Sequence, residues 1–373
     1  MSKIFKFDTD DLIYNRFDII HPENVVDLFY DYEGYTYKIQ VYINDGIAEP
    51  NIWGKSLPQN VFESLINDIF KKNDIFAIKI TRGRNQYKNF LEKTTDVRVP
   101  LPKSFEELMN RIARKDRATI RRKLRWLDER IGTLRIDKYL RQCIPNEVVN
   151  TYFRWKRDTH GTDYGMTPQE YLDQYHVTDA LMMRAGDMDV AVAFYCKVNE
   201  AVFFENFSYN KILKKYSPGL LMYVKLMEEL IKRGCKYNYM GKGGYIYKTR
   251  FGAQTEQAYI GVIYRQEIVD RLNTFFNKNG IKDVAFYGFG VCGHHFFQLS
   301  QELALNIVYG IDMVADGTVN LPIYKPDQIP ETDVVFITLN SKSDEVEDLL
   351  RHKCSRIFYW NDVLDAVIND YKK

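Results

Sequence analysis

The feature that most limits the fold of this sequence is a glycine motif close to the C-terminus. An apolar run from Val284 leads into Gly288, Gly290 and Gly293 with the spacing G-x-G-x-x-G, and a helical pattern follows. A second apolar run ends at Asp312, about 20 residues further on, where such motifs place a ribose-binding acid. We therefore predict a nucleotide-binding loop, in which the glycines approach a diphosphate and Asp312 holds ribose hydroxyls.

The motif comes late in the chain, so we expect its unit to be an accessory to another activity. About 280 residues precede it, whereas a dehydrogenase usually places it first, which makes a dehydrogenase the least favoured function. Residues 280–373 are too few for a complete dinucleotide fold and predict a small Rossmann-like parallel α/β domain. This segment resembles the small domains found with sugar-modifying transferases, where a nucleotide-sugar binds. A purely structural or oligomer-forming unit is a nearly equal alternative.

Composition limits the class of protein further. The length of 373 residues suggests two or three domains. Five cysteines are scattered without a C-x-x-C pair, so we expect no metal site and no disulfide framework, as in a reducing cytoplasm. No apolar run approaches the ~20 residues of a membrane helix, and the N-terminus lacks the apolar core of a signal peptide. These features predict a cytoplasmic protein.

The apolar pattern divides the rest of the chain into two α+β regions. Strand and helix patterns alternate over residues 1–100, and a long basic helix over 104–130 opens the region 101–265. Strand patterns over 180–209, separated by turn signals, predict an antiparallel meander. Helices are expected over 146–160, from Thr167-Pro168 and over 220–233. The predicted fold class is α/β, with an α+β core ahead of the parallel C-terminal domain.

Four stretches between Phe105 and Tyr264 carry a resemblance to a known family. They are residues 116–123 of the basic helix, the strands 190–194 and 203–210, the helix opening 215–221 and the glycine loop 240–252. Together they resemble the CelD/BcsL-like acyltransferases, a branch of the GNAT superfamily close to the Fem-type peptidoglycan aminoacyltransferases. The resemblance implies a GNAT-type core over residues 101–265, with residues 1–100 as a degenerate partner GNAT unit. The chain lacks the fuller Gln/Arg-x-x-Gly-x-Gly/Ala loop of ordinary GNAT enzymes.

The helix opening Ser217-Pro218-Gly219 is the predicted acyl-CoA site. Free amides and the dipole at a helix N-terminus attract phosphate, and the resemblance implies that the pyrophosphate of CoA lies there. Ser217 would offer its hydroxyl, and Gly219 and Leu220 would offer their amides. A plain helix cap is the alternative that the residues alone favour.

Three residues are the catalytic candidates. Glu205, on a strand among phenylalanines, would accept the proton of an attacking amine, since apolar neighbours raise the pKa of a carboxylate. Tyr209 would protonate the leaving thiolate, as the resemblance implies, and Lys248 would stabilise a tetrahedral oxyanion. Tyr247 and Arg250 follow the same glycine loop and are substrate-binding candidates, with Arg250 meeting phosphate or carboxylate. A solvent-facing surface role is the plainer alternative for these residues.

The basic helix supplies two further substrate-binding candidates. Arg114, Arg117, Arg121 and Arg125 lie three or four residues apart and share one face. An anionic partner such as tRNA, a nucleotide-sugar or a polyprenyl phosphate would suit this face, although a solvated helix face is commoner. Arg117 and Arg121 are preferred because the resemblance includes them. The net charge of +2 argues against a large nucleic-acid interface.

These residues together predict a bacterial N-acyltransferase. It would transfer an acyl group from acyl-CoA to an amino group of a nucleotide-linked sugar, for a surface polysaccharide. The first alternative is aminoacyl transfer from charged tRNA, as in the Fem-type enzymes. The second is a non-catalytic scaffold that binds a nucleotide-sugar. The acyl group, the acceptor and the oligomeric state stay open.

Overall fold

The computed structural model describes residues 3–4, 24–52, 56–161, 164–175, 177–198, 200–240, 249–313, 321–339 and 342–373. The described residues form two compact units. The described part of unit 1 lies within residues 3–4, 24–94 and 258–373, and the described part of unit 2 lies within residues 95–257. The three domains predicted from the sequence, with boundaries near 100, 265 and 280, stay predictions.

Unit 2 is built on a mixed sheet with the strand order β6, β11, β10, β9, β8, β7. These strands span Leu91–Pro100, Tyr237–Tyr239, Ala201–Tyr209, Met188–Val198, Asp179–Ala185 and Leu134–Leu140. The predicted antiparallel meander is confirmed as β8, β9 and β10. One pair differs from the rest, because β11 lies parallel to β10 while it is antiparallel to β6.

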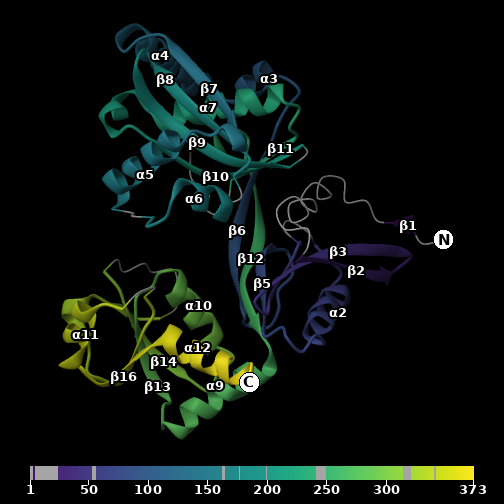
Figure 1. Ribbon diagram of the computed structural model, residues 1–373, viewed down its shortest axis with the longest axis vertical. Coiled ribbons are helices and arrows are strands. Elements are labelled where there is room, and N and C mark those ends of the chain that lie inside the picture. The colour runs from purple at the N-terminus through teal and green to yellow at the C-terminus, as the bar shows by residue number, and fades with distance from the viewer. Residues whose placement is uncertain are drawn as a thin grey trace. The chain divides into compact units, whose positions relative to one another are not determined.

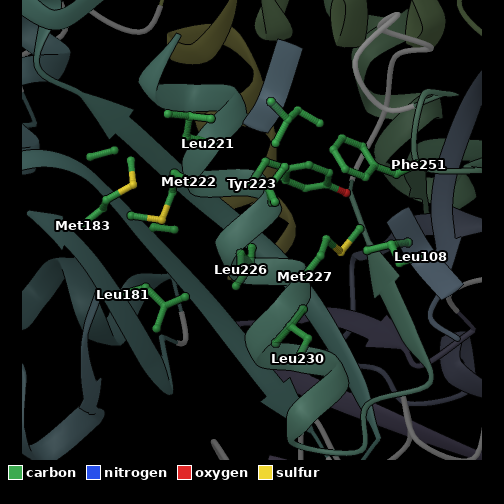
Figure 2. Close-up of a cluster of buried hydrophobic side chains, with 14 of the residues drawn as sticks. Leu108, Leu181, Met183, Leu221, Met222, Tyr223, Leu226, Met227, Leu230 and Phe251 are labelled. Atoms are coloured by element: carbon green, nitrogen blue, oxygen red, sulfur yellow. The ribbon is translucent and has the colours of Figure 1, made fainter. Parts of the chain in front are cut away.

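Helices cover both faces of this sheet (Figure 1). On one face lie α3, α4 and α7, which span Phe105–Arg111, Arg114–Arg130 and Pro218–Lys232. On the other lie α5 and α6, which span Asn146–His160 and Pro168–Gln174. Alternate residues of the strands point to the two helix layers, as in β8, where Leu181 and Met183 join the α7 core and Ala180 and Met182 join the α5 core. Figure 2 shows how α7 directs Leu226, Met227 and Leu230 into the first core.

The basic helix predicted over 104–130 is in fact two helices, so that expectation was wrong. Ile112 leaves the helical conformation with φ −79° and ψ 137°, and its side chain is buried in the core. The carbonyls freed at the end of α3 are met by the guanidinium of Arg117, which donates to Met109 O and Asn110 O at 3.3 Å. Ser104 accepts from the amide of Glu107 as the sequence predicts, so the start of α3 is capped.

The first part of unit 1 is a sheet with the strand order β1, β3, β4, β5, β12, with β2 paired to β3. These strands span Lys3–Ile4, Tyr35–Asn44, Ile47–Pro50, Ala77–Gly83, Gln254–Tyr264 and, for β2, Val25–Tyr32. Helix α2, Gln59–Phe70, buries one apolar face with Phe62, Leu65 and Ile66. Strand β5 pairs with β12, although the two lie far apart in the sequence.

Helix α9, Gln266–Lys278, leads from β12 into a second sheet, in which all five strands are parallel. Its strand order is β15, β14, β13, β16, β17. These strands span Ile323–Tyr324, Asn306–Ile311, Asp283–Tyr287, Thr332–Ile337 and Cys354–Tyr359. The helices α10, α11 and α12 span Val291–Ser300, Asp344–Arg351 and Trp360–Tyr371. The chain adds strands on one side of β13 and then on the other, so its direction of winding reverses between β13 and β16.

Candidate functional site

The parallel strands β10 and β11 of unit 2 are paired over only three residues. The pairing runs from Ala201 opposite Tyr237 to Phe203 opposite Tyr239, whose rings stack at 5.2 Å. Strand β10 then continues to Tyr209, and its register against β9 shifts between Phe204 and Asn206. The second half of β10 therefore has no β11 residue beside it among the described residues, while its other side stays paired with β9.

A cavity of about 330 Å³ lies beside this half of β10. Its lining comes from β10, from the 3-10 helix η3 (Lys211–Tyr216) and from the start of α7. The lining residues are Phe207, Tyr209, Lys214, Ser217, Pro218, Gly219, Leu220, Met222 and Tyr223. Apolar side chains and aromatic rings form much of this lining, and Lys214 and Ser217 add polar groups just before the helix. Such a cavity fits a ligand with an apolar arm and an anionic end.

The start of α7 supplies the anion-binding groups of this cavity. Ser217 precedes the helix in the left-handed conformation, with φ 57° and ψ 53°, and Pro218 occupies the first helical position. The first helical hydrogen bond joins Leu221 N to Ser217 O at 3.2 Å, so the amides of Gly219 and Leu220 precede it and are available to a ligand. The helix dipole favours a negative charge at this point.

The predicted cofactor-binding residues of α7 come together with one catalytic candidate. Ser217, Gly219, Leu220 and Tyr209 all line the cavity of unit 2. Glu205 lies on β10 at the register shift, but its side chain is outside the described residues, as are Tyr247 and Lys248 entirely. Their roles stay predictions.

The three arginine candidates lie apart from this cavity. Arg117 donates to the carbonyls at the end of α3, which is a structural role. Arg121 lines a separate cavity of about 380 Å³ between α3, α4 and α7. Arg250 lies 3.7 Å from Asp116, measured from Nε to Oδ2, and both side chains are partly exposed. None of these contacts tests a substrate-binding role.

Sequence reasoning missed several residues that line the cavity. Phe207 alternates with Tyr209 along β10, so both face α7, and Met222 and Tyr223 lie one turn into that helix. The hydroxyl of Tyr223 donates to Met240 Sδ at 2.5 Å and is buried. Lys214 adds a cation beside the start of α7. The lysine pair at 214–215, separated from Ser217 by one residue, was the available signal.

The glycine motif of unit 1 forms a tight turn between β13 and α10. Gly288 has φ 98°, which favours glycine, and a Cβ on Gly293 would lie 2.0 Å from Gly288 O, so helix and strand meet there without a side chain. A Cβ on Gly290 would meet none of the described atoms within 4 Å. Asp312 follows β14 and accepts a hydrogen bond from the amide of Phe289. The acid and the glycine loop are therefore neighbours.

The two histidines that follow the glycine motif contact other parts of unit 1. His294 Nδ1 lies 3.6 Å from a carboxylate oxygen of Glu92. His295 Nε2 lies 3.2 Å from the hydroxyl of Tyr264, and the two rings stack. Burial lowers the pKa of His295 to about 4, so this ring is neutral at physiological pH.

Two further observations concern the described residues only. No group of three or more His, Cys, Asp or Glu side chains among them is placed to hold a metal ion. None of the described helices is both long enough and apolar enough to cross a bilayer.

Comparisons with known proteins identify the central part of unit 2. Residues 114–249 match a family model described as an acetyltransferase (GNAT) domain. No curated protein matches the chain. Among solved structures, FemX has a TM-score of 0.45 at 9% identity, with 69% of this chain and 96% of that chain covered. L-PGS from Bacillus licheniformis has a TM-score of 0.42 at 10% identity, covering 75% and 97%. A tandem GNAT protein from the clavulanic acid biosynthesis pathway has 0.39 at 8%, covering 68% and 87%.

The matched segment contains every residue that lines the cavity beside β10. The chain therefore carries a GNAT acyltransferase domain, and the protein is an acyltransferase. A domain of this family implies acyl-CoA as the co-substrate.

Proposed function

We propose that the protein transfers an acyl group from acyl-CoA to the amino group of a nucleotide-linked sugar, in the biosynthesis of a bacterial surface polysaccharide. The observation that carries the acyl-transfer part is the cavity that joins the start of α7 to the half of β10 that extends beyond its pairing with β11. The acceptor part draws its support from the parallel sheet of unit 1.

The donor half of the proposal follows from the two ends of the cavity. The amides of Gly219 and Leu220, the Ser217 hydroxyl and the Lys214 ammonium would bind the diphosphate of CoA. The apolar side of the cavity, with Phe207 and Met222, suits the pantetheine arm and leads the thioester along β10.

The chemistry needs a base, an oxyanion partner and an acid. The amine nitrogen of the acceptor attacks the thioester carbonyl, and Glu205 takes the proton that the amine loses. Lys248 would stabilise the oxyanion of the tetrahedral intermediate. The C–S bond then breaks, and Tyr209, which lines the cavity, would give its proton to the departing thiolate. The products are an amide and free CoA.

The proposed acceptor, a nucleotide-linked sugar, is supported by the strand order of the parallel sheet of unit 1. We interpret this sheet as a Rossmann-like nucleotide site. Counted from β13 as the first strand, the order is 3-2-1-4-5, and ligands of such sheets bind at the carboxyl ends where the winding reverses. That point is the turn that carries Gly288, Gly290 and Gly293. The glycines would admit a diphosphate, and Asp312 would bind the ribose.

Aminoacyl transfer from charged tRNA is a second candidate function. The exposed arginines of α4 favour it, because an acceptor stem would meet them through its phosphates. Arg121 would take part in such an interface under this alternative. A non-catalytic scaffold that binds a nucleotide-sugar is the third candidate.

The test is to incubate the purified protein with acyl-CoAs and nucleotide-linked amino sugars and to measure free CoA and acylated product. Release of CoA that requires one acceptor, and that ribonuclease leaves unchanged, supports the proposal. Glu205→Gln should lower kcat by roughly a hundredfold or more, the range for a lost general base. Glu129→Gln, on the exposed end of α4, is the matched control and should leave kcat unchanged. Activity that appears only with charged tRNA would replace the proposal with the second candidate. Ligand binding without turnover, unchanged by Glu205→Ala and Lys248→Ala, would support the scaffold.

A further inference from the structure

One flank of α4 gathers three cations around an indole ring. The guanidinium carbons of Arg122 and Arg130 lie 5.1 and 5.0 Å from the centre of the Trp126 ring, and Lys123 Nζ lies 5.8 Å from it. This flank packs against η3, where Lys123 donates a hydrogen bond to the carbonyl of Lys215.

The acids that follow in α4 do not neutralise this flank. Asp128 accepts a hydrogen bond from the amide of Leu134 at 2.8 Å. Glu129 pairs with Arg125 at 3.7 Å, and Arg125 is not one of the three cations around Trp126, so this acid offsets a fourth cation of the helix. The flank therefore keeps its positive charge.

The neighbouring helix η3 adds an exposed aliphatic side chain and three more cations. Ile212 is 81% exposed, more than any other large apolar side chain among the described residues. Its amide donates to Asn210 Oδ1 at 3.1 Å, so the start of η3 is fixed in place. Lys211, Lys214 and Lys215 surround it in the sequence and are exposed. We call Arg122, Lys123, Arg130 and these three lysines the basic rim.

The basic rim and the exposed aliphatic side chain of Ile212 together indicate which kind of anionic partner fits this surface. The phosphates of a nucleic acid would attract the cations but give Ile212 no apolar surface, and single strands bind by stacking on free aromatic faces. The ring of Trp126 is already covered by its own cations. An anionic bilayer offers both partners, because its headgroups attract the lysines and arginines while its interfacial layer accepts apolar side chains.

We propose that the basic rim and Ile212 dock unit 2 on the surface of an anionic lipid bilayer. The inference goes beyond the proposed function and does not depend on it. Lys214 belongs both to the rim and to the lining of the cavity beside β10. Docking would therefore bring the mouth of that cavity to the membrane surface.

The test is sedimentation of the full chain with vesicles of phosphatidylcholine alone and with vesicles that also contain phosphatidylglycerol. The protein should sediment with the anionic vesicles only, and less so as salt rises. Arg122→Glu and Lys211→Glu should each lower the partition coefficient by at least about fivefold, the factor that one basic residue contributes at such a surface. Ile212→Asp should lower it by about tenfold or more.

Two control variants make the same chemical changes elsewhere on unit 2. Lys232→Glu reverses a charge at the C-terminal end of α7, the opposite end of that helix from η3, and Leu140→Asp replaces a side chain that is 54% exposed at the end of β7. Both should bind vesicles like the wild type, and all five variants should keep the wild-type melting temperature. Equal losses in the controls, failure to bind anionic vesicles, or retention on RNA without retention on vesicles would each overturn the proposal.

Discussion

The backbone of Gly219, in the first turn of α7, lies directly against the ring of Phe207 on β10. A Cβ built on the glycine would come within 3.1 Å of Phe207 Cε2 and within 3.4 Å of the Tyr209 ring. A side chain at position 219 would therefore press on two rings that line the cavity proposed to receive the acyl donor.

We expect substitutions of Gly219 to weaken CoA binding in proportion to their size. In Gly219→Ala the Phe207 ring must move by a few tenths of an ångström, while alanine gains about 0.5–1 kcal/mol over glycine within a helix. Stability should thus change little, while the Kd for CoA rises about threefold to tenfold for alanine and further for valine. Calorimetric titration with CoA and thermal melting measure the two effects. An unchanged Kd in Gly219→Val would show that CoA does not bind there.

Arg250 and Asp116 provide a test of substrate binding that separates it from stability. Their 3.7 Å pair is partly exposed, and such pairs contribute about 0.2–1 kcal/mol to the free energy of unfolding. If Arg250 meets an anionic substrate, Arg250→Gln should raise KM by about tenfold while Asp116→Asn leaves KM within about twofold. Steady-state kinetics on both variants decide the matter. Equal changes in KM would mean that Arg250 only orders its neighbourhood.

The glycines of the β13–α10 turn should respond differently to the same substitution. Gly290 has φ −74° and ψ −162°, a conformation open to any residue, so Gly290→Ala should fold like the wild type. Its methyl group would stand where a diphosphate approaches, and binding of UDP or ADP should weaken by about tenfold or more. Gly293→Ala should instead lower stability by about 1–3 kcal/mol or more, because its Cβ would overlap Gly288 O. Calorimetric titration and urea unfolding report these outcomes, and unaltered nucleotide binding by Gly290→Ala would refute the site.

His295 should make the stability of unit 1 depend on pH. Its pKa is about 4 in the folded chain and 6.5 in the unfolded chain, so between these values the unfolded chain binds the extra proton. The free energy of unfolding is therefore highest above pH 6.5 and falls as pH drops towards 4. Between pH 7 and pH 5 the loss should be about 2 kcal/mol.

The variant His295→Gln can still hydrogen-bond the Tyr264 hydroxyl and lacks the titration. Urea unfolding at pH 7 and pH 5 should show a smaller loss for this variant than for the wild type. His294→Gln serves as the control. It makes the same substitution at the neighbouring histidine, whose ring lies beside the Glu92 carboxylate rather than the Tyr264 hydroxyl. The prediction fails if His295→Gln loses as much stability at pH 5 as the wild type.

Local patterns were sufficient to predict several elements of this fold. Helix α5 spans the predicted residues 146–160, because its apolar positions recur at helical spacing and Gly161 ends it in the left-handed conformation. The capping box of Thr167 and Glu170 starts α6 where the sequence indicates. The meander of β8, β9 and β10 follows from alternation and turn residues. The α7 residues of the cavity were predicted because a proline and a glycine mark the helix start.

The features that local patterns did not predict depend on contacts between residues distant in sequence. The break at Ile112 occurs because burial of that side chain outweighs helix propensity, which no local pattern records. The part played by Phe207 and Tyr223 in the cavity depends on where β11 leaves β10, and this is set by the pairing of β11 with β6. Lys214 was passed over because a lysine before a helix is common on protein surfaces.

The pairing of β5 with β12 has a consequence for the order in which the chain folds during synthesis. Ala77 pairs with Tyr264, so the first sheet of unit 1 cannot close until the whole of unit 2 has been translated. At ribosomal rates of about 5–20 residues per second, β5 waits roughly 10–40 seconds for its partner. Every residue of unit 2 has been translated by residue 257, so this unit can fold first on the ribosome. During that interval β5 lacks its β12 partner along one edge, and an unpaired strand edge of this kind is prone to aggregation and calls for a chaperone.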